Sequence, residues 1–262
     1  MDPSPELKAA LDAAERAAVI ARALYRHNLE VRIKADKSPV TEADLRCEIA
    51  IREILEARFP GHGFYGEETG SHGADAESLW LVDPIDGTKA FVREYPMFST
   101  QIALMRRGQI VLGVSSAPVY GELAYAERGR GAYLNGAALC VSEVSTLDAA
   151  ALSSGNLKSL AAGPQWMRYG RLVAGVNRIR GYGDFLHYHL LAAGKIDAVI
   201  ESDVNILDIA ASAAIVTEAG GRFTELDGAP ITLGSGSVLA TNGRLHGLVL
   251  EALGTAPGVN RP

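Results

Sequence analysis

The chain has few cysteines, no surplus of positive charge and no long apolar run. Its two cysteines, Cys47 and Cys140, are too few for a disulfide framework or a zinc site, and each is expected to be a buried structural thiol. The formal net charge of -6 is the reverse of what nucleic-acid binders usually carry. No apolar stretch approaches the roughly 18 residues of a membrane span, and the first residues lack the basic start of a signal peptide. We therefore expect a cytoplasmic protein that binds neither nucleic acid nor membranes.

Helical periodicity dominates the beginning of the chain and predicts helices over residues 5–25 and 41–58. Thr41 is the expected N-cap of the second helix, with Asp44 in the capping-box position. The apolar side of that helix is predicted to consist of Leu45, Ile49, Ile51, Ile54 and Leu55. A glycine-rich loop over 63–73 precedes four predicted strands, at 79–82, 98–105, 110–115 and 121–126. This part should form two helices packed on a largely antiparallel sheet.

Helices and short strands alternate in the second part of the chain. Strands are predicted at 150–153, 172–174, 196–201, 222–224 and 237–241, and helices at 185–193, 207–219 and 245–253. Such alternation is typical of an α/β arrangement. We expect two closely packed halves, an α+β half over residues 1–140 and an α/β half over residues 141–262, with a site between them.

The most informative segment is Asp83-Pro84-Ile85-Asp86-Gly87-Thr88, where two carboxylates follow an apolar strand. Together with the Ile85 carbonyl they could surround one hard cation such as magnesium, which prefers oxygen ligands. A turn with an Asx cap is the competing interpretation. Glu67-Glu68 could equally be solvated, Asp44 a helix cap, and Asp208 a favourable first-turn acid. Taken together, these acids suggest a cluster that only cations could hold together.

Four motifs resemble the inositol monophosphatase superfamily: Val40-Thr41-Glu42-Ala43-Asp44, Gly66-Glu67-Glu68, Asp83 to Thr88, and Asp208-Ile209-Ala210-Ala211 with Glu218-Ala219-Gly220-Gly221. The resemblance implies an α/β fold, a layered αβαβα sandwich, and a homodimer. It implies two or three Mg²⁺ ions held by Glu67, Asp83, the Ile85 carbonyl, Asp86 and Asp208. It also implies that Asp44, Glu68 and Thr88 place or activate the attacking water, while the amides at Gly87 and Thr88 bind phosphate. Leu207 departs from the family pattern, which usually has Trp there.

The implied activity is hydrolysis of a phosphate monoester by metal-activated water, which needs no Ser, Cys or His nucleophile. A binding protein that kept the fold and lost catalysis is the alternative. Most metal ligands would then come from residues 1–140, and residues 141–262 would supply substrate contacts and the last metal ligand, Asp208.

The substrate is expected to be a small polar metabolite phosphate, with histidinol phosphate favoured. Segments 34–44, 180–185 and 190–197 are similar to the histidinol-phosphatase branch, which indicates histidine biosynthesis. Glu201 and Asp184 are expected to pair with the substrate amine, and Asn205 to bond the amine or imidazole. Inositol 1-phosphate and 3′(2′),5′-bisphosphate nucleotides remain alternatives. Glu201 would serve an inositol hydroxyl equally well, and Asp184 could simply cap a helix. His187 and His189 are expected to serve packing.

Overall fold

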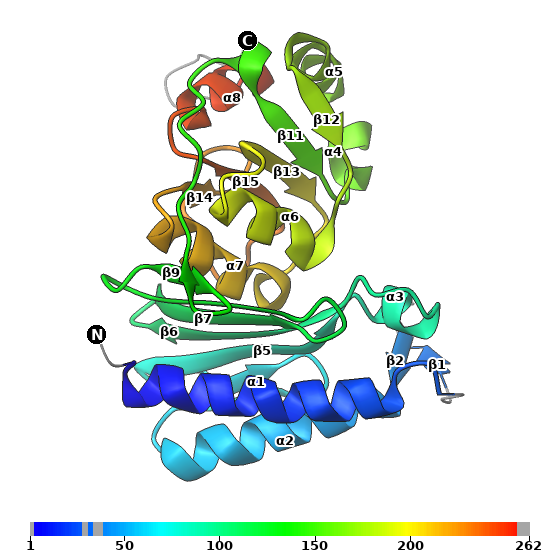
Figure 1. Ribbon diagram of the computed structural model, residues 1–262, viewed down its shortest axis with the longest axis vertical. Coiled ribbons are helices and arrows are strands. Elements are labelled where there is room, and N and C mark those ends of the chain that lie inside the picture. Colours follow the sequence, from blue (N-terminus) through cyan, green and yellow to red (C-terminus); the bar gives the residue numbers. More distant parts are fainter. Residues whose placement is uncertain (1–2, 28–30, 34–38, 256–262) are drawn as a thin grey trace. The chain divides into compact units, whose positions relative to one another are not determined.

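A computed structural model of the chain describes residues 3–27, 31–33 and 39–255 (Figure 1). Its contacts group the chain into two compact units. The first comprises residues 1–137 and 207–215, and the second comprises residues 138–206 and 216–262. The segment 207–215, which contains Asp208, therefore groups with the first unit and not with the residues around it. The division of roles between residues 1–140 and 141–262 stays a prediction.

An eight-stranded sheet forms the centre of the first unit, in the order β10-β9-β8-β7-β6-β5-β3-β4. The strands from β5 to β9 pair antiparallel with their neighbours, whereas β3 pairs with β5 in parallel. The strands are β3 (Gly63–Gly66), β4 (Gly70–His72), β5 (Ser78–Asp86), β6 (Ser99–Arg106), β7 (Gln109–Ala117), β8 (Glu122–Glu127), β9 (Ala132–Leu134) and β10 (Ala137–Ala138). The expected antiparallel strands are thus present, and β5 extends through both aspartates of the central motif.

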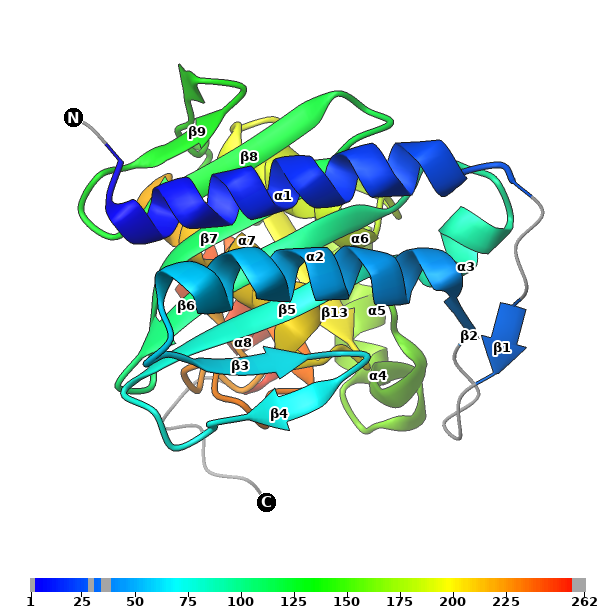
Figure 2. The same ribbon diagram turned by 90° about the horizontal axis from the view of Figure 1, so that it is seen from below.

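Two long helices lie side by side against this sheet, α1 (Pro5–Leu24) over β6 and β7 and α2 (Glu42–Arg58) over β5 (Figure 2). They bury a common apolar core with the sheet, in which Phe64, Trp80 and Ile102 are almost fully enclosed. A two-stranded ribbon of β1 (Val31–Ile33) and β2 (Pro39–Thr41) precedes α2, and the short helix α3 (Thr88–Val92) follows β5.

The predicted apolar side of α2 is wrong in part. Leu45 and Ile49 are 37% and 49% exposed, while the buried positions include Asp44 and Glu48, both at 0%. The buried stripe therefore runs through residues 44, 47, 48, 51 and 55, which is a regular helical face that happens to carry two carboxylates. The face of α2 that hydrophobicity alone indicated is therefore rotated about the helix axis from the face that is buried.

The second unit is built on a five-stranded sheet in the order β12-β11-β13-β15-β14. The pairs β11–β12 and β11–β13 are parallel, and β13–β15 and β14–β15 are antiparallel. Helices α4, α5 and α8 bury apolar side chains in one core with this sheet. The elements are the 3-10 helix η1 (Leu147–Ala149), β11 (Ala151–Ser154), α4 (Lys158–Ala162), α5 (Trp166–Gly175), β12 (Arg178–Arg180), α6 (Asp184–Ala192), β13 (Ala198–Ser202), β14 (Arg222–Thr224), β15 (Ser237–Thr241) and α8 (His246–Leu253).

Three further expectations need correction. Residues 172–174, predicted as a strand, lie in helix α5. The loop expected over residues 63–73 contains the antiparallel pair β3–β4. Cys140 is exposed, whereas Cys47 is buried as expected. Residues 34–38, the first part of the segment 34–44 that is similar to the histidinol-phosphatase branch, lie outside the described residues. Within the described part of the chain, every helix is too short or too polar to cross a lipid bilayer.

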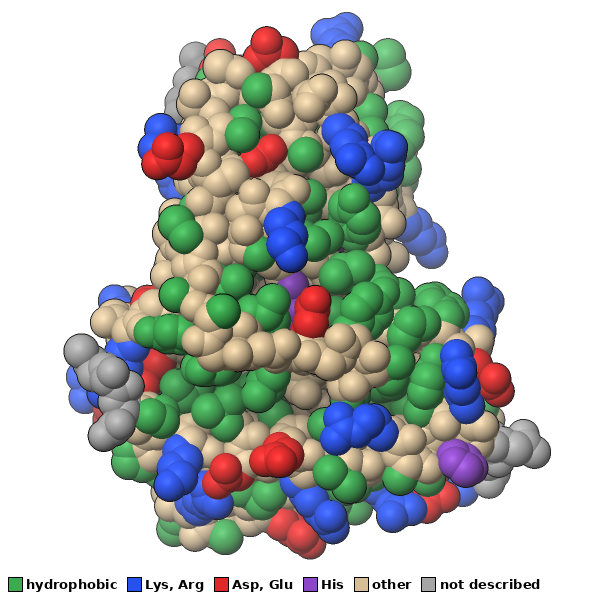
Figure 3. Space-filling view, viewed as in Figure 1, with side chains coloured by type: hydrophobic (Ala, Val, Ile, Leu, Met, Phe, Trp, Pro, Cys, Tyr) green, Lys and Arg blue, Asp and Glu red, His purple; other side chains and the backbone are tan. Residues whose placement is uncertain are grey.

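The exposed charges over α1 and α2 are interspersed by sign on the face seen in Figure 3. Ion pairs at the surface of these helices include Arg46–Glu42, Arg52–Glu56 and Arg58–Asp12, with distances of 3.3, 2.7 and 2.7 Å. Exposed pairs of this kind contribute little to stability, typically about 0–1 kcal/mol. The stability of this layer therefore comes from the buried faces of the helices.

Candidate metal centre and active site

The end of β5 places two acidic side chains, Asp83 and Asp86, in one cluster. Residues three apart on a regular strand would point to opposite faces of the sheet. The pairing of β5 with β6 is irregular between Asp83 and Asp86, as at a β-bulge. The direction in which the side chains leave the strand therefore changes at this point. Asp83 Oδ1 also accepts a hydrogen bond from the Ile85 N–H at 3.0 Å, and Ser99 donates to Asp86 Oδ2 at 3.2 Å. The two interpretations of this segment, an Asx-type turn and a cation site, are thus compatible with each other.

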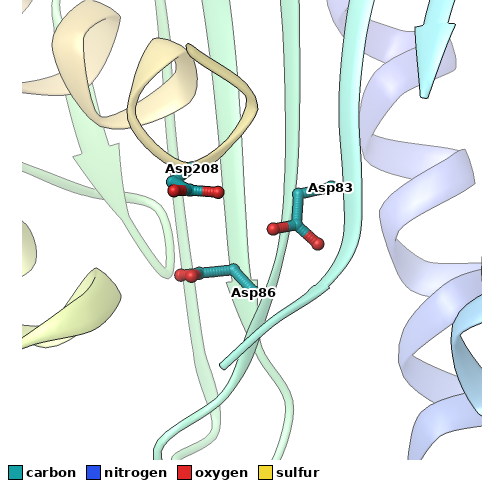
Figure 4. A group of neighbouring side chains, drawn as sticks. All are labelled: Asp83, Asp86 and Asp208. Carbon is teal, nitrogen blue, oxygen red and sulfur yellow. The ribbon is translucent and has the colours of Figure 1, made fainter. Parts of the chain in front are cut away.

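Asp208 completes the cluster from another part of the sequence. It lies in the first turn of α7 (Ile206–Glu218), within the segment that groups with the first unit. Gly113 on β7 allows the helix backbone to come close, since a Cβ at Gly113 would lie 2.4 Å from the Ala211 carbonyl oxygen. The carboxylates of Asp83, Asp86 and Asp208 point toward one another (Figure 4), and their nearest ligand atoms all lie within 4.8 Å.

The electrostatics of this trio fit a divalent cation. Burial raises the pKa of Asp83 well above its usual value, and the negative charges of Glu67, Asp86 and Asp208 raise it further. Asp83 is only 3% exposed, so its charge cannot be relieved by solvent. An ionised group in such a place is normally paired or bound to a metal. All the converging donors are oxygen atoms, the ligand type that Mg²⁺ prefers.

Thr88 and Asp44 form a hydrogen-bonded pair beside the end of β5. Thr88 Oγ1 lies 3.1 Å from Asp44 Oδ1 and 3.0 Å from the Ile85 carbonyl oxygen. The other oxygen of Asp44 accepts from the Thr41 N–H and Oγ1 at 2.8 and 2.6 Å, and the bond from the N–H belongs to the expected capping box. Burial raises the pKa of Asp44, and the hydrogen bonds from Thr41 and Thr88 partly offset that rise. Asp44 therefore serves as a cap and as the partner of Thr88 at the same time.

Gly87 shapes the turn between β5 and α3. Its φ of 88° is in the left-handed region, and a Cβ there would lie 2.4 Å from the Met97 carbonyl oxygen. The backbone consequently turns sharply after Asp86, and the Gly87 carbonyl begins α3 by accepting from the Ala90 N–H at 2.8 Å. The chain at Gly87 and Thr88, expected to bind phosphate, is thus fixed by a conformation that suits glycine.

Glu67 and Glu68 lie in the turn that follows β3, and both are half-buried. Glu67 is near enough to Asp83 for its charge to raise the pKa of that carboxyl, although it is not one of the three closest ligands. The turn is held by Glu48, a residue that sequence reasoning missed. Its Oε2 and Oε1 accept from the N–H groups of Glu68 and Thr69 at 2.8 and 2.7 Å. The only sequence signal was its position one helical turn after Asp44.

A second acidic group lies in the second unit, where Asp184 and Glu201 come close together. Burial raises the pKa of Asp184, and the charge of Glu201 raises it further, while His187 lowers it. Glu201 accepts hydrogen bonds from the Tyr188 hydroxyl at 2.8 Å and from the Asn156 N–H at 3.1 Å, and His187 Nε2 lies 3.2 Å from its carboxylate in an ion-pair contact.

The surroundings of Glu201 leave its carboxylate little freedom. Burial alone would raise its pKa, but the contacts with His187, Tyr188 and Asn156 outweigh burial and lower it. A Cβ at Gly155 would overlap the Glu201 carboxylate, so the backbone also confines it. His187 and His189 are buried, as expected for packing, but His187 additionally contacts Glu201.

Asp184 begins α6 after the N-cap Gly183, with φ of 44°, so it is not the N-cap itself. Asn205 is exposed at the start of α7, and its proposed contact with substrate stays a prediction. Leu207, in place of the family's usual Trp, is buried at 4% exposure. Leu207 is thus packed, directly before Asp208 in the sequence.

Comparisons with known proteins agree with this geometry. The model of the inositol monophosphatase family matches residues 2–257. The chain belongs to the inositol monophosphatase family. It is similar to the histidinol-phosphatase of Mycobacterium tuberculosis, at 42% identity over 254 residues that cover 95% of this chain and 97% of that protein. It is also similar to the inositol-1-monophosphatase of Caulobacter vibrioides, at 37% identity over 239 residues, covering 87% of this chain and 92% of that protein.

The fold is likewise matched by solved structures. The extragenic suppressor protein SuhB from Bartonella henselae superposes with a TM-score of 0.88 at 31% identity, covering 95% of this chain and 98% of that one. The expected family and its α/β fold are therefore confirmed. The similar curated proteins named above are phosphatases, which confirms the expected enzyme class, a phosphoric monoester hydrolase. The roles of individual residues, the metal and the substrate stay predictions.

Proposed function

We propose that this chain is a magnesium-dependent phosphatase whose preferred substrate is histidinol phosphate. The observation that carries the metal-dependent chemistry is the convergence of Asp83, Asp86 and Asp208, with ligand atoms within 4.8 Å. Glu67 and the Ile85 carbonyl are proposed to complete the ligand set for two or three Mg²⁺ ions. When bound, these ions supply positive charge to the phosphate and acidify the attacking water. A cytoplasmic homodimer is part of the same proposal and rests on the family resemblance alone.

The residues of the chain then have separate tasks in hydrolysis. Thr88 donates its hydroxyl proton to Asp44, at 3.1 Å, and so leaves an oxygen lone pair to orient the attacking water. Glu68 is proposed to receive a proton from the same water. The N–H groups at Gly87 and Thr88, at the beginning of α3, are proposed to bind phosphate oxygens. No side-chain nucleophile takes part, so no covalent phosphoenzyme should form.

Replacing Asp86 by Asn tests the metal proposal. The variant should keep its fold, because Asn retains the acceptor for the Ser99 hydroxyl that lies 3.2 Å from Asp86 Oδ2. Its kcat should fall by several orders of magnitude at limiting magnesium. The matched control is Asp75→Asn, which neutralises an exposed acid elsewhere in the same unit. Near wild-type turnover by Asp86→Asn would show that this residue is not a ligand.

The substrate proposal rests on the acidic pair in the second unit. Histidinol phosphate carries a protonated amine, and a cation would relieve the repulsion between Asp184 and Glu201. Glu201 precedes Asp208 by seven residues in the sequence. The similarity to a histidinol-phosphatase at 42% identity supports the same choice.

The decisive experiment compares substrates across variants. Glu201→Gln and Asp184→Asn should lower kcat/KM for histidinol phosphate by roughly 10- to 100-fold, since a hydrogen bond to a charged group contributes about 1.5–3 kcal/mol. Turnover of an aryl phosphate, whose organic group carries no positive charge, should change far less. Glu143→Gln is the matched control, because the Glu143 side chain is 88% exposed. If the wild type turns over inositol 1-phosphate at least tenfold better than histidinol phosphate, the preference is wrong.

Inositol 1-phosphate is the second candidate. The similarity to an inositol-1-monophosphatase at 37% identity favours it. The Glu201 carboxylate, held in place by Tyr188 and Asn156, could accept a hydrogen bond from a ring hydroxyl as well as from an ammonium group. The two candidates separate in the assay above, because only a cationic substrate should depend strongly on the second acid, Asp184.

A further inference from the structure

Glu48 is a buried carboxylate to which the catalytic scheme above gives no task. It is 0% exposed on the inner face of α2, although an acid is almost never fully buried unless it is paired. Its two oxygens each accept one backbone N–H, from Glu68 at 2.8 Å and from Thr69 at 2.7 Å. These are charge-assisted bonds, the strong class of hydrogen bond in proteins. They tie helix α2 directly to the turn that carries Glu67 and Glu68.

The space for this carboxylate exists only because residue 66 has no side chain. A Cβ at Gly66 would lie 2.5 Å from Glu48 Cδ and 2.6 and 2.7 Å from its two oxygens. The backbone of Gly66 does not need a positive φ, so conformational freedom is not the reason for this glycine. The fit between Gly66 and Glu48 is therefore a steric one, built around the carboxylate.

Asp44, one turn earlier on α2, contacts the other acidic segment through a side chain. Its Oδ1 contacts Thr88 Oγ1 at 3.1 Å, and Thr88 follows directly on the segment that carries Asp83 and Asp86. Residues four apart lie on one face of a helix. One rigid helix thus holds both metal-bearing segments, the β5–α3 turn through Asp44 and the β3–β4 turn through Glu48.

We propose that Glu48 is a positioning residue for the metal centre, which fixes the Glu67–Thr69 turn so that Glu67 is preorganised to bind magnesium. The inference rests on the proposed function, because it assigns a task toward the same metal. It extends that function to a residue that touches neither substrate nor metal. Partners that orient metal ligands commonly change metal affinity by about 10–100-fold when they are removed.

Glu48→Gln is the direct test, because it keeps the size of the side chain and replaces one acceptor oxygen by an NH₂ group that faces an N–H donor. Magnesium binding is measured by isothermal titration without substrate. Amide hydrogen exchange at Glu68 and Thr69 is measured in the metal-free protein. We expect magnesium affinity to fall about 10-fold or more and both amides to exchange faster. Substrate KM should change less than the magnesium requirement.

Two controls on α2 separate positioning from general loss of stability. Glu53→Gln removes an exposed acid from the same helix and should leave both readouts unchanged. Ile51→Val trims the same buried stripe and should lower the urea concentration at which the protein unfolds, without weakening magnesium binding. A decrease in magnesium affinity that Ile51→Val reproduces would overturn the proposal.

Gly66→Ala disturbs the same contact by placing a Cβ against the Glu48 carboxylate, and it tests the proposal even if Glu48→Gln does not fold. It should reproduce the lower magnesium affinity, whereas Gly61→Ala should not, since a Cβ at Gly61 meets nothing within 4 Å. Wild-type magnesium affinity and protected amides in the folded variants would refute the positioning role. If the wild-type protein itself binds no magnesium, the proposed function fails instead, so the two failures are distinguishable.

Discussion

Replacing Asp83 by Asn should stabilise the metal-free protein and remove its stabilisation by magnesium. Asp83 is 3% exposed, and its Oδ1 accepts from the Ile85 N–H at 3.0 Å, a bond that an Asn oxygen can keep. The substitution removes the charge that Asp86, Asp208 and Glu67 repel. Its new NH₂ group can donate to the neighbouring carboxylates. The same substitution weakens the metal site, because a neutral amide is a poorer magnesium ligand than a carboxylate.

The expected magnitude follows from the geometry. Two unit charges 4.8 Å apart, the upper limit of the ligand-atom separations in the trio, repel by about 3.5 kcal/mol at an effective dielectric constant of 20. Partial protonation of the cluster relieves some of this repulsion, so we expect Asp83→Asn to raise the free energy of unfolding by about 1–3 kcal/mol without metal. Wild-type protein should gain about 2.7 kcal/mol at a magnesium concentration of 100 times Kd, and the variant much less.

The increase in stability that Asp83→Asn causes in the metal-free protein should depend on pH in a defined direction. The pKa of Asp83 is raised above its usual value of 3.8, so in the metal-free protein the native state holds this proton more tightly than the unfolded chain. Native stability therefore falls as the pH rises from about 3.8 to the raised native pKa, and levels off above it. The variant lacks this group, so its advantage over the wild type should grow through that interval.

Urea denaturation in EDTA and in magnesium, at several pH values between 4 and 8, measures all three effects. Asp75→Asn is the control, because it removes one negative charge at an exposed position of the same unit. A metal-free Asp83→Asn protein that is less stable than the wild type at pH 8 would refute the argument from like-charge repulsion. Undiminished stabilisation by magnesium would refute the assignment of Asp83 as a ligand.

Two other predictions concern single side chains. Thr88→Ala should lower kcat far more than it raises KM, because the contact to water matters mainly in the transition state; steady-state kinetics test this, and a rise in KM alone would contradict it. His187→Gln should make the protein unfold at a higher pH on acidification. His187 helps to lower the pKa of Glu201, a contribution to stability that is present above the usual value of 4.5 and is lost as the pH falls through the native pKa. Denaturation between pH 3 and 6 measures this, and an acid transition identical to that of the wild type would contradict it.

The helices and strands that sequence patterns predicted best are those whose buried face is apolar. Helix α1 agrees within one residue with the expected range of 5–25, and its buried side is apolar and includes Leu7, Ala14 and Ala18. Helix α2 was placed correctly, yet its inner face was assigned wrongly. Leu45 and Ile49 had to be exposed because Asp44 and Glu48 occupy the buried stripe. Hydrophobic periodicity cannot locate the buried face of a helix when that face carries acidic side chains.

Short apolar runs were the other source of error. Residues 172–174 read as a strand because Leu-Val-Ala stands between glycines, at positions 170 and 175. In the structure these residues lie in α5, where Tyr169 and Leu172 are buried at helical spacing. A run of three apolar residues fits a strand or a helix equally well, and packing against α8 decides between them.

The convergence of Asp83, Asp86 and Asp208 was predictable because these acids stand in motifs of recognisable type and order, whereas the residues that support the acids were not. His187 was expected to serve packing, and its contact with Glu201 at 3.2 Å depends on a pairing between α6 and β13 that no local pattern encodes. Glu48 was missed for the same reason, because its partners are backbone N–H groups twenty and more residues away. Backbone donors have no sequence signature.

The alanine-rich inner face of α1 explains how α2 can keep two acids buried. The fully buried positions of α1 include Ala10, Ala13 and Ala17, which are small enough for a neighbouring helix to approach closely. Cys47, between Asp44 and Glu48 on the stripe of α2, packs against this face with its Sγ 3.5 Å from the Ala17 carbonyl oxygen. Larger side chains on α1 would displace α2 and, with it, both carboxylates. The small residues of α1, which touch no proposed ligand, therefore fix the distance at which α2 presents Asp44 to Thr88 and Glu48 to the Glu67–Thr69 turn.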